Sequence, residues 1–262
     1  MEKKYYPQTL VQSLGLVLLS ITATTPLLFI NRLNLVSEYI FTHIFFITFV
    51  FNLLSIFYFK NRKNKDEFNF NFKIGNVVFI FILLIITFQL AINIPLNFIL
   101  NDYYNENKIN VINSFITLIP FIFLSSFFEE LIFRGIILKG YLIKYDAKKA
   151  ILFSSIFFSL LHLNFTQSLG ALLFSLLIGY VYYLSKSIGI TILLHLTNNI
   201  VALTGVYLLN NYGNFKIEKT SDLYGTYSSY LIVISFFLLI YLFYYIIKNK
   251  KNITSELKRI DR

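Results

Sequence analysis

Three charged side chains stand close together inside an otherwise apolar run, and they are where this sequence could do chemistry. They are Glu129, Glu130 and Arg134. A charged side chain at bilayer depth costs at least about 3 kcal/mol even on the lenient insertion scales. On a helix, Glu130 and Arg134 stand four residues apart and can pair, whereas Glu129 points elsewhere. We therefore predict that Glu130 is held by Arg134 and that Glu129 acts as a general base. The alternative is a helix end at the membrane interface, with the charged pair reaching to water.

Two histidines and an asparagine are the other residues that could move protons or bind a metal at membrane depth. They are His162, His195 and Asn199. Asn199 follows His195 by four residues, so the imidazole and the amide share one helical face. Taken singly, a buried histidine or a membrane-embedded asparagine often only holds helices together by hydrogen bonds. Because the expected depths of these residues overlap with that of Glu129, we predict that they converge in one site.

Such a site is suited to the hydrolysis of peptide or other acyl bonds. A glutamate with a histidine can activate a water, and a second histidine with an asparagine can donate hydrogen bonds to the oxyanion of a tetrahedral intermediate. Nucleophilic serines are possible in principle, but none stands in a nucleophile-elbow context. The serines concerned are Ser125, Ser126 and Ser159.

A metal mechanism stays open at this point. The H-E-x-x-H signature of soluble zinc proteases is absent from the sequence. However, Glu129, His162 and His195 make a plausible three-ligand set for a divalent metal such as zinc. The spacing of these residues neither requires nor excludes the metal.

The composition indicates an integral membrane protein. Of the 262 residues, 56% are hydrophobic and only 14% are charged, far fewer than in a soluble domain of this size. There is no cysteine, which excludes disulfides, thiolate metal sites and a cysteine nucleophile. The net charge of +10 lies in short flanks between apolar segments. We therefore attribute this charge to membrane topology and not to a nucleic-acid partner.

The apolar segments predict an all-α polytopic protein of about eight transmembrane helices in a single domain, residues 1–262. The expected spans are about 9–30, 39–58, 74–100, 111–140, 150–163 and 168–184, then one that begins after Lys186 and one at 229–247. A cleaved signal peptide is the alternative for the first span, but its apolar run is long and no clear cleavage site follows. Pro95 is expected to end or kink the third helix. Nineteen of the 23 Lys and Arg residues flank one side of these spans, so both termini are predicted to be cytoplasmic.

Three short motifs resemble those of the CAAX-protease and bacteriocin-processing family of intramembrane endopeptidases, also called the Abi family. An E-E-x-x-x-R motif begins at Glu129, an F-x-x-x-H motif runs from Phe158 to His162, and an H-x-x-x-N motif runs from His195 to Asn199. The resemblance covers a catalytic core of about residues 111–205.

The resemblance implies a role for each matched residue. It implies that Glu129 activates water with His162, that Arg134 holds Glu130, and that His195 acts with Asn199 at the oxyanion. It also implies a cavity open toward the cytosol. Members of the family include eukaryotic enzymes that remove the last three residues of prenylated proteins, and bacterial relatives tied to bacteriocin immunity, peptide processing and surface-protein display.

The resulting hypothesis is an intramembrane endopeptidase that cleaves a membrane-associated or small secreted peptide or protein. The abundance of Phe, Ile, Asn and Lys resembles AT-rich bacterial coding, so we expect a multi-pass protein of a bacterial cell membrane. The main alternative is a non-catalytic bacteriocin-immunity or scaffold protein, in which the polar cluster only locks helix packing. A proton-coupled transporter is a further alternative, although the sequence shows no inverted repeat.

Overall fold

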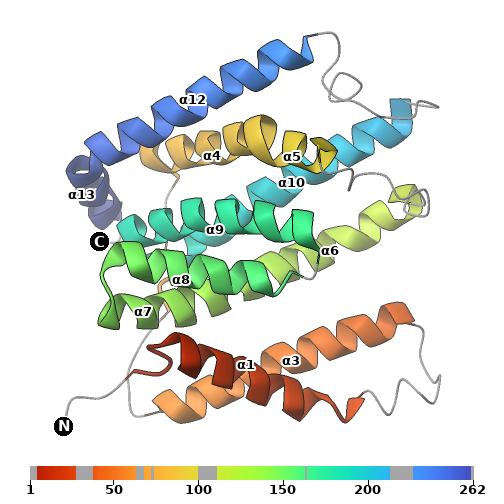
Figure 1. The fold of residues 1–262 in the computed structure, drawn as a ribbon, viewed down its shortest axis with the longest axis vertical. Helices are drawn as coiled ribbons and strands as arrows, with labels where there is room; N and C mark the ends of the chain where they lie inside the picture. Colours follow the sequence, from red (N-terminus) through yellow and green to blue (C-terminus); the bar gives the residue numbers. More distant parts are fainter. Residues whose placement is uncertain are drawn as a thin grey trace. The chain divides into compact units, whose positions relative to one another are not determined.

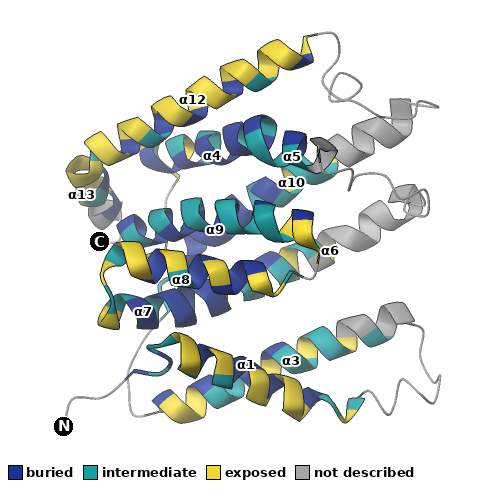
Figure 2. Ribbon diagram, in the orientation of Figure 1, coloured by how far each residue is buried: buried dark blue, intermediate teal, exposed yellow. Residues whose placement is uncertain are grey.

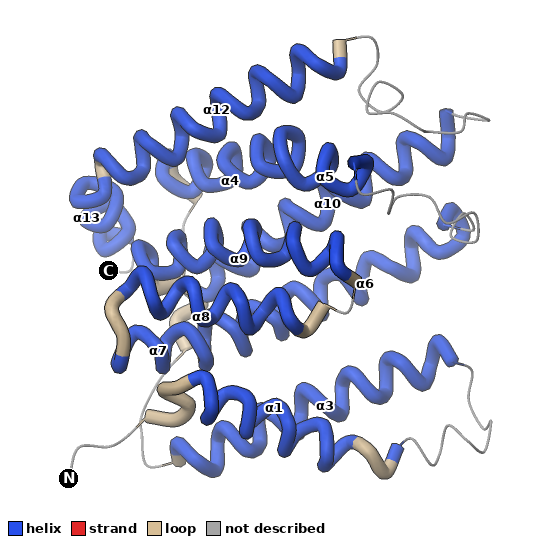
Figure 3. Tube along the Cα trace, in the orientation of Figure 1, coloured by secondary structure: helices blue, strands red, loops and turns tan. Residues whose placement is uncertain are grey.

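Every regular element that the structure describes is a helix, so the predicted all-α class is confirmed. The computed structural model describes residues 5–27, 38–62, 68–71, 74–99, 111–162, 164–212 and 227–260. Figure 3 traces the described helices in blue and the described loops in tan.

A helix stands at each of the eight predicted spans. The helices are α1 (Leu10–Thr24), α3 (Glu38–Asn61), α4 (Asn76–Phe88) with α5 (Ile94–Ile99), α6 (Val111–Glu130), α8 (Ala147–Leu160), α9 (Phe165–Ser185), α10 (Ile188–Tyr212) and α12 (Ser228–Lys248). Among the described residues, four helical stretches are long and apolar enough to cross a bilayer: 44–61, 76–96, 165–185 and 228–248. The protein is therefore a polytopic membrane protein, whereas the count of eight spans and the cytoplasmic termini stay predictions.

The chain divides into two compact units, each with its own packing, and the assignment of residues 1–262 to a single domain stays a prediction. The first unit comprises residues 1–67 and 135–153. In it α1 and α3 lie side by side (Figure 1). The hydroxyl of Tyr5 donates to the backbone oxygens of Gly135 at 3.2 Å and Ile136 at 3.3 Å. The hydroxyl of Tyr141 donates to Ser13 Oγ at 2.9 Å. These bonds tie the segment before α1 and α1 itself to the stretch that follows Arg134.

The second unit, residues 68–134 and 154–262, has an apolar core formed by α4, α9, α10, α12 and α13 (Lys250–Ile260). Figure 2 shows α12 as mostly exposed, with a narrow buried stripe. The exposed side chains of α12 are nearly all large and apolar, as expected of a helix that faces lipid. Helix α13 folds because Ile253 and Leu257, four residues apart, bury one apolar face against this core.

Two helices contain wide π-helical turns where the sequence predicts regular helix. They are η1 (Gln89–Asn93), between α4 and α5, and η3 (Leu131–Leu138), between α6 and α7 (Lys139–Lys144). The helix continues past Pro95, which was expected to end or kink it. In a regular helix, the ring of Pro95 would press on the carbonyl of Ala91. The wider turn at η1, in which the N–H of Ile94 donates to Gln89 O, lies at that point.

Gly140 provides a test of the packing within the first unit. A Cβ at Gly140 would collide with the backbone carbonyl of Pro7, which cannot turn aside as a side chain can. We expect Gly140→Ala to lower the free energy of unfolding by about 1–3 kcal/mol, the usual cost of overpacking. The matched change Gly15→Ala meets only the Tyr6 hydroxyl, at 4.0 Å, and should be neutral or stabilising by up to about 1 kcal/mol. Unfolding of both variants in detergent checks this, and equal stabilities would contradict it.

Candidate active site

The six predicted site residues all belong to the second unit and come from four neighbouring segments. Glu129 and Glu130 end α6, and Arg134 lies in η3 directly after them. His162 follows the end of α8, whereas His195 and Asn199 lie one turn apart on α10. Helices α6 and α10 pack against each other, which brings the glutamates to the histidine.

Glu130 lies at the centre of a buried set of three charged or titratable side chains. Its Oε1 accepts from Arg134 Nη1 at 2.9 Å and from His195 Nδ1 at 2.7 Å. The side chains of Glu130 and Arg134 are 0% and 1% exposed. The predicted pairing of Glu130 with Arg134 is therefore confirmed. Its extension to His195 was missed, because a contact across 65 residues has no local spacing that would signal it.

Arg134 is fixed by further contacts that the sequence did not reveal. Its Nη2 donates to Ser175 Oγ at 2.9 Å and to Ser175 O at 3.3 Å, on α9. Its guanidinium carbon lies 5.1 Å from the centre of the Phe158 ring, an arrangement typical of a cation–π contact. Serine is common in membrane helices for packing reasons, so Ser175 carried no signal in the sequence. Phe158 was visible only as the first residue of the F-x-x-x-H motif.

The bond to Glu130 determines which nitrogen of His195 carries the proton. A carboxylate oxygen paired with a guanidinium only accepts, so His195 Nδ1 is the donor. In the neutral imidazole the lone pair is then on Nε2, which lies 3.9 Å from Glu129 Oε2. That distance is too long for a direct hydrogen bond. The ring of Phe174 packs edge-on against the imidazole at 5.0 Å and holds its plane.

His162 presents its ring in the same way. Its Nδ1 lies 3.0 Å from the backbone oxygen of Phe158, which only accepts, so Nδ1 is again the donor and Nε2 carries the lone pair. Glu129 interacts electrostatically with both His162 and His195. The side chain of Glu129 is 27% exposed, in contrast to fully buried Glu130. As predicted, one glutamate is held and the other is accessible.

Asn199 ends a chain of polar side chains. Its Nδ2 donates to Ser126 Oγ at 2.9 Å, and its Oδ1 accepts from Asn198 Nδ2 at 3.3 Å. Asn198 in turn accepts from Gln89 Nε2 through its backbone oxygen at 3.0 Å and Oδ1 at 2.7 Å. Gln89 Oε1 accepts from Asn93 at 3.0 Å. Ser126, which was considered as a nucleophile, is buried and binds the Asn199 amide.

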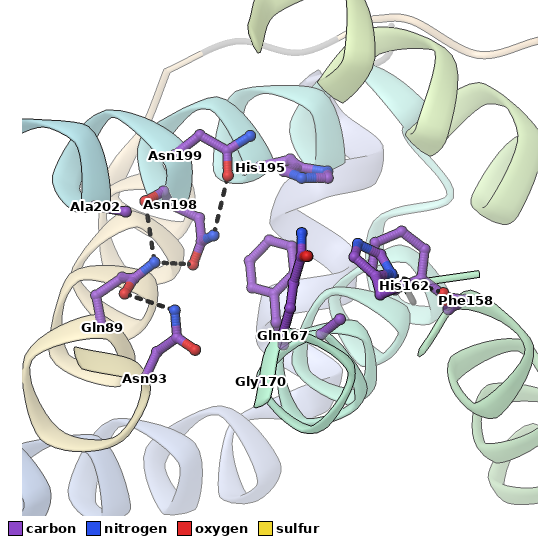
Figure 4. A pocket seen from close by; sticks show the side chains of 12 residues that line it. Gln89, Asn93, Phe158, His162, Gln167, Gly170, His195, Asn198, Asn199 and Ala202 are labelled. Atoms are coloured by element: carbon purple, nitrogen blue, oxygen red, sulfur yellow. Dashed lines mark hydrogen bonds between the residues drawn. The ribbon is translucent and has the colours of Figure 1, made fainter. Parts of the chain in front are cut away.

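A cavity of about 180 Å³ opens between these groups (Figure 4). His162 and His195 line it together with carboxamides from three helices. The full lining is Gln89, Asn93, Phe158, His162, Gln167, Gly170, Ala171, Phe174, His195, Asn198, Asn199 and Ala202. Glu129 approaches it beside His195. Among the lining residues none is Lys, Arg, Asp or Glu, so the described wall is polar without carrying a fixed charge.

The proposed metal ligands do not form a metal-binding group in the part of the chain that the structure describes. There, no three His, Cys, Asp or Glu side chains are arranged to hold a metal ion. Glu129 and His195 approach each other to 3.9 Å, but no such set includes His162. The metal set Glu129, His162 and His195 stays a prediction, and the chemistry below is derived from the protein's own acids and bases.

The buried contacts of Glu130 predict a large loss of stability when its charge is removed. Glu130→Gln leaves Arg134 buried without its counter-charge, a change that costs about 3–5 kcal/mol in buried pairs. Asp146→Asn is the matched control, because it removes an exposed i,i+3 pair with Lys149 and should leave unfolding unchanged. Denaturant unfolding of both variants in detergent checks this. Equal midpoints for wild type and Glu130→Gln would show that the buried pair does not support the fold.

One of three comparisons with known proteins found a match. Residues 111–201 match the family model described as Type II CAAX prenyl endopeptidase Rce1-like. The matched stretch contains all six predicted site residues, whereas Gln89 and Asn93 lie outside it. Searches of curated proteins and of solved structures found no match. The match of residues 111–201, which include Glu129, Glu130, Arg134, both histidines and Asn199, to the Rce1-like family of CAAX prenyl endopeptidases therefore confirms the resemblance seen in the sequence.

Proposed function

We propose that this protein is an intramembrane endopeptidase in which Glu129 activates a water for attack on a peptide bond. The observation that carries the proposal is the position of His195. Glu130 holds its Nδ1 at 2.7 Å, which leaves Nε2 at 3.9 Å from the accessible carboxylate of Glu129. The accessible carboxylate thus lies next to an oriented imidazole, beside a cavity that both histidines line.

The first step transfers one proton and forms one bond. The Glu129 carboxylate takes a proton from the water while the lone pair on His162 Nε2 accepts the other hydrogen and orients the oxygen. The water oxygen then attacks the carbonyl carbon of the substrate, and the carbonyl π electrons move to its oxygen. The products of the step are protonated Glu129 and a tetrahedral oxyanion.

The second step breaks the carbon–nitrogen bond. Asn199 Nδ2 is the neutral donor available to the oxyanion. His195, which the resemblance also places at the oxyanion, donates there only when Nε2 is protonated, since Nδ1 is engaged with Glu130. Protonated Glu129 gives its proton to the leaving nitrogen as the oxyanion collapses. One carboxylic acid and one amine result, and Glu129 returns to its starting state.

The proposed substrate is a peptide or a membrane-associated protein, with a small secreted peptide or a lipid-associated protein as the preferred class. The site lies in a bundle of apolar helices, so a substrate held at or in the bilayer reaches it without crossing bulk water. A cavity of 150 Å³ holds a group the size of benzene. The cavity here, at about 180 Å³, has room for about one side chain beside the scissile bond.

Glu129→Gln is the direct test of the base. The change keeps the shape of the side chain and removes its basicity, so turnover should fall by about 100- to 10,000-fold while the protein stays folded. Glu256→Gln, on the exposed face of α13, is the matched control and should cleave like wild type. Purified proteins are incubated with a peptide pool and the products are read by mass spectrometry.

The same experiment separates the alternatives. No cleavage by wild type, together with a Glu129→Gln variant that keeps the cellular phenotype, would support an immunity or scaffold protein instead. Proton uptake in vesicles that depends on Glu129, again without cleavage, would support a proton-coupled transporter.

Chelation tests the metal-free route derived above. If Glu129 and the histidines act as acid and bases alone, 1,10-phenanthroline should leave the cleavage rate unchanged within experimental error. The purified enzyme should then also carry no stoichiometric zinc by elemental analysis. Loss of activity on chelation, with recovery on adding zinc, would support the metal set Glu129, His162 and His195.

A further inference from the structure

Four carboxamide side chains run head to tail along one wall of the cavity (Figure 4). The NH₂ of Asn93 donates to Gln89, that of Gln89 to Asn198, and that of Asn198 to Asn199, at 3.0, 2.7 and 3.3 Å. The chain ends where Asn199 Nδ2 donates to Ser126 Oγ at 2.9 Å. At every link, an amide nitrogen faces the oxygen of the next residue.

The four amides must all donate in the same direction along the chain. A carboxamide has an acceptor on one side and two donors on the other, so turning one amide around breaks its bonds to both neighbours. Gln89 commits both hydrogens of its Nε2 to Asn198, one to the backbone oxygen and one to Oδ1. Gln89 is fully buried and Asn198 is 9% exposed, so water competes little for these bonds. Gln89 therefore determines which way Asn198 faces.

Asn198 in turn orients the amide of Asn199. Because Asn198 presents its Nδ2, Asn199 turns its own Oδ1 toward Asn198 and its Nδ2 toward Ser126. One hydrogen of this Nδ2 binds Ser126, and no described residue takes the second. Asn199 lines the cavity, beside His195 one turn earlier on α10. Asn199 is thus a cavity-lining amide whose Nδ2 keeps one hydrogen that no described residue accepts.

We propose that Gln89 is a positioning residue of the reaction, which fixes the Asn199 amide as a donor to the developing oxyanion. This inference rests on the endopeptidase function proposed above. Gln89 lies outside the stretch 111–201 that matches the family, and it opens the π-helical turn η1. Turns of this kind are frequent at functional sites. The turn that continues the helix past Pro95 is thereby also the one that carries Gln89 and Asn93.

A purely structural role makes a different prediction. If the amides only hold helices together, removing Gln89 lowers stability and leaves the turnover of folded enzyme unchanged. If Gln89 positions Asn199, turnover falls while substrate binding holds, because the donor matters only once charge develops on the oxygen.

The first test is kinetic and uses Gln89→Met, which keeps the length of the side chain and removes its hydrogen bonds. Thr87→Val is the matched control, because Thr87 is buried in the same helix and donates only to the backbone oxygens of Leu83 and Leu84. Both variants should lower the apparent Tm by similar amounts. Only Gln89→Met should lower kcat, by about 10- to 100-fold with KM unchanged, which is less than the loss of a whole oxyanion donor.

A second variant tests the direction of the chain. A carboxylate only accepts hydrogen bonds, so in Gln89→Glu the Nδ2 of Asn198 should turn toward residue 89. Asn198 then presents its Oδ1 to Asn199, and the amide of Asn199 should turn around as well. We expect kcat to fall at least as far as in Gln89→Met. A kcat like that of Thr87→Val in folded Gln89→Met would overturn the positioning role.

The second test needs no substrate. Gln89 and Asn199 share no direct hydrogen bond and are joined through Asn198. The apparent Tm loss of the double variant Gln89→Met with Asn199→Ala should therefore be smaller than the sum of the single losses. Thr87→Val with Asn199→Ala should be additive. If the Tm losses are additive in both pairs, Gln89 is not coupled to Asn199 through Asn198, whether or not any peptide is cleaved.

The two tests together distinguish this inference from the proposed function. Coupled Tm losses with kcat unchanged would overturn the positioning role and leave the endopeptidase intact. Coupled Tm losses in a protein whose wild type cleaves no peptide would overturn the endopeptidase, and with it the role of Gln89 in catalysis. Coupled losses with a kcat defect confirm both.

Discussion

One carboxylate oxygen, Glu130 Oε1, accepts hydrogen bonds from both Arg134 and His195, and the site depends on this double contact. In an apolar interior, an ionised group is tolerated only when it is paired and hydrogen-bonded. Arg134 compensates the charge of Glu130, and Glu130 in turn fixes the proton of His195 on Nδ1. The same interaction therefore supports the fold at the end of α6 and decides which nitrogen of His195 faces Glu129.

Polar groups of two unlike kinds line the cavity. The two imidazoles carry the lone pairs on Nε2, because Glu130 and the backbone oxygen of Phe158 engage both Nδ1 atoms. The carboxamide chain ends beside His195 in Asn199, whose Nδ2 is a donor. Acyl hydrolysis needs this asymmetry, since the attacking water must lose a proton while the carbonyl oxygen gains hydrogen bonds.

The sequence could predict what depends on local spacing. The i,i+4 relation of Glu130 and Arg134 and that of His195 and Asn199 follow from helix geometry alone, and the long apolar segments predict the helices. It could not predict the contact of Glu130 with His195, which depends on how α6 packs against α10. Ser175 and Gln89 look like ordinary polar residues of membrane helices, and only the fold reveals their partners. The π-helical turns and the packing of α13 likewise arise from tertiary contacts that leave no short motif.

The protonation of His195 tests this account most directly. The sequence has only three histidines, so ¹⁵N-histidine labelling followed by NMR, with His43→Gln and His162→Gln to assign the signals, isolates the ring of His195. At a pH where the ring is neutral, the account predicts a proton on Nδ1 and a bare Nε2. It also predicts that Glu130→Ala, which removes the acceptor, lets the Nε2–H form appear. A neutral His195 that carries its proton on Nε2 in the wild type would contradict the account, because Glu130 would then not orient the imidazole toward Glu129.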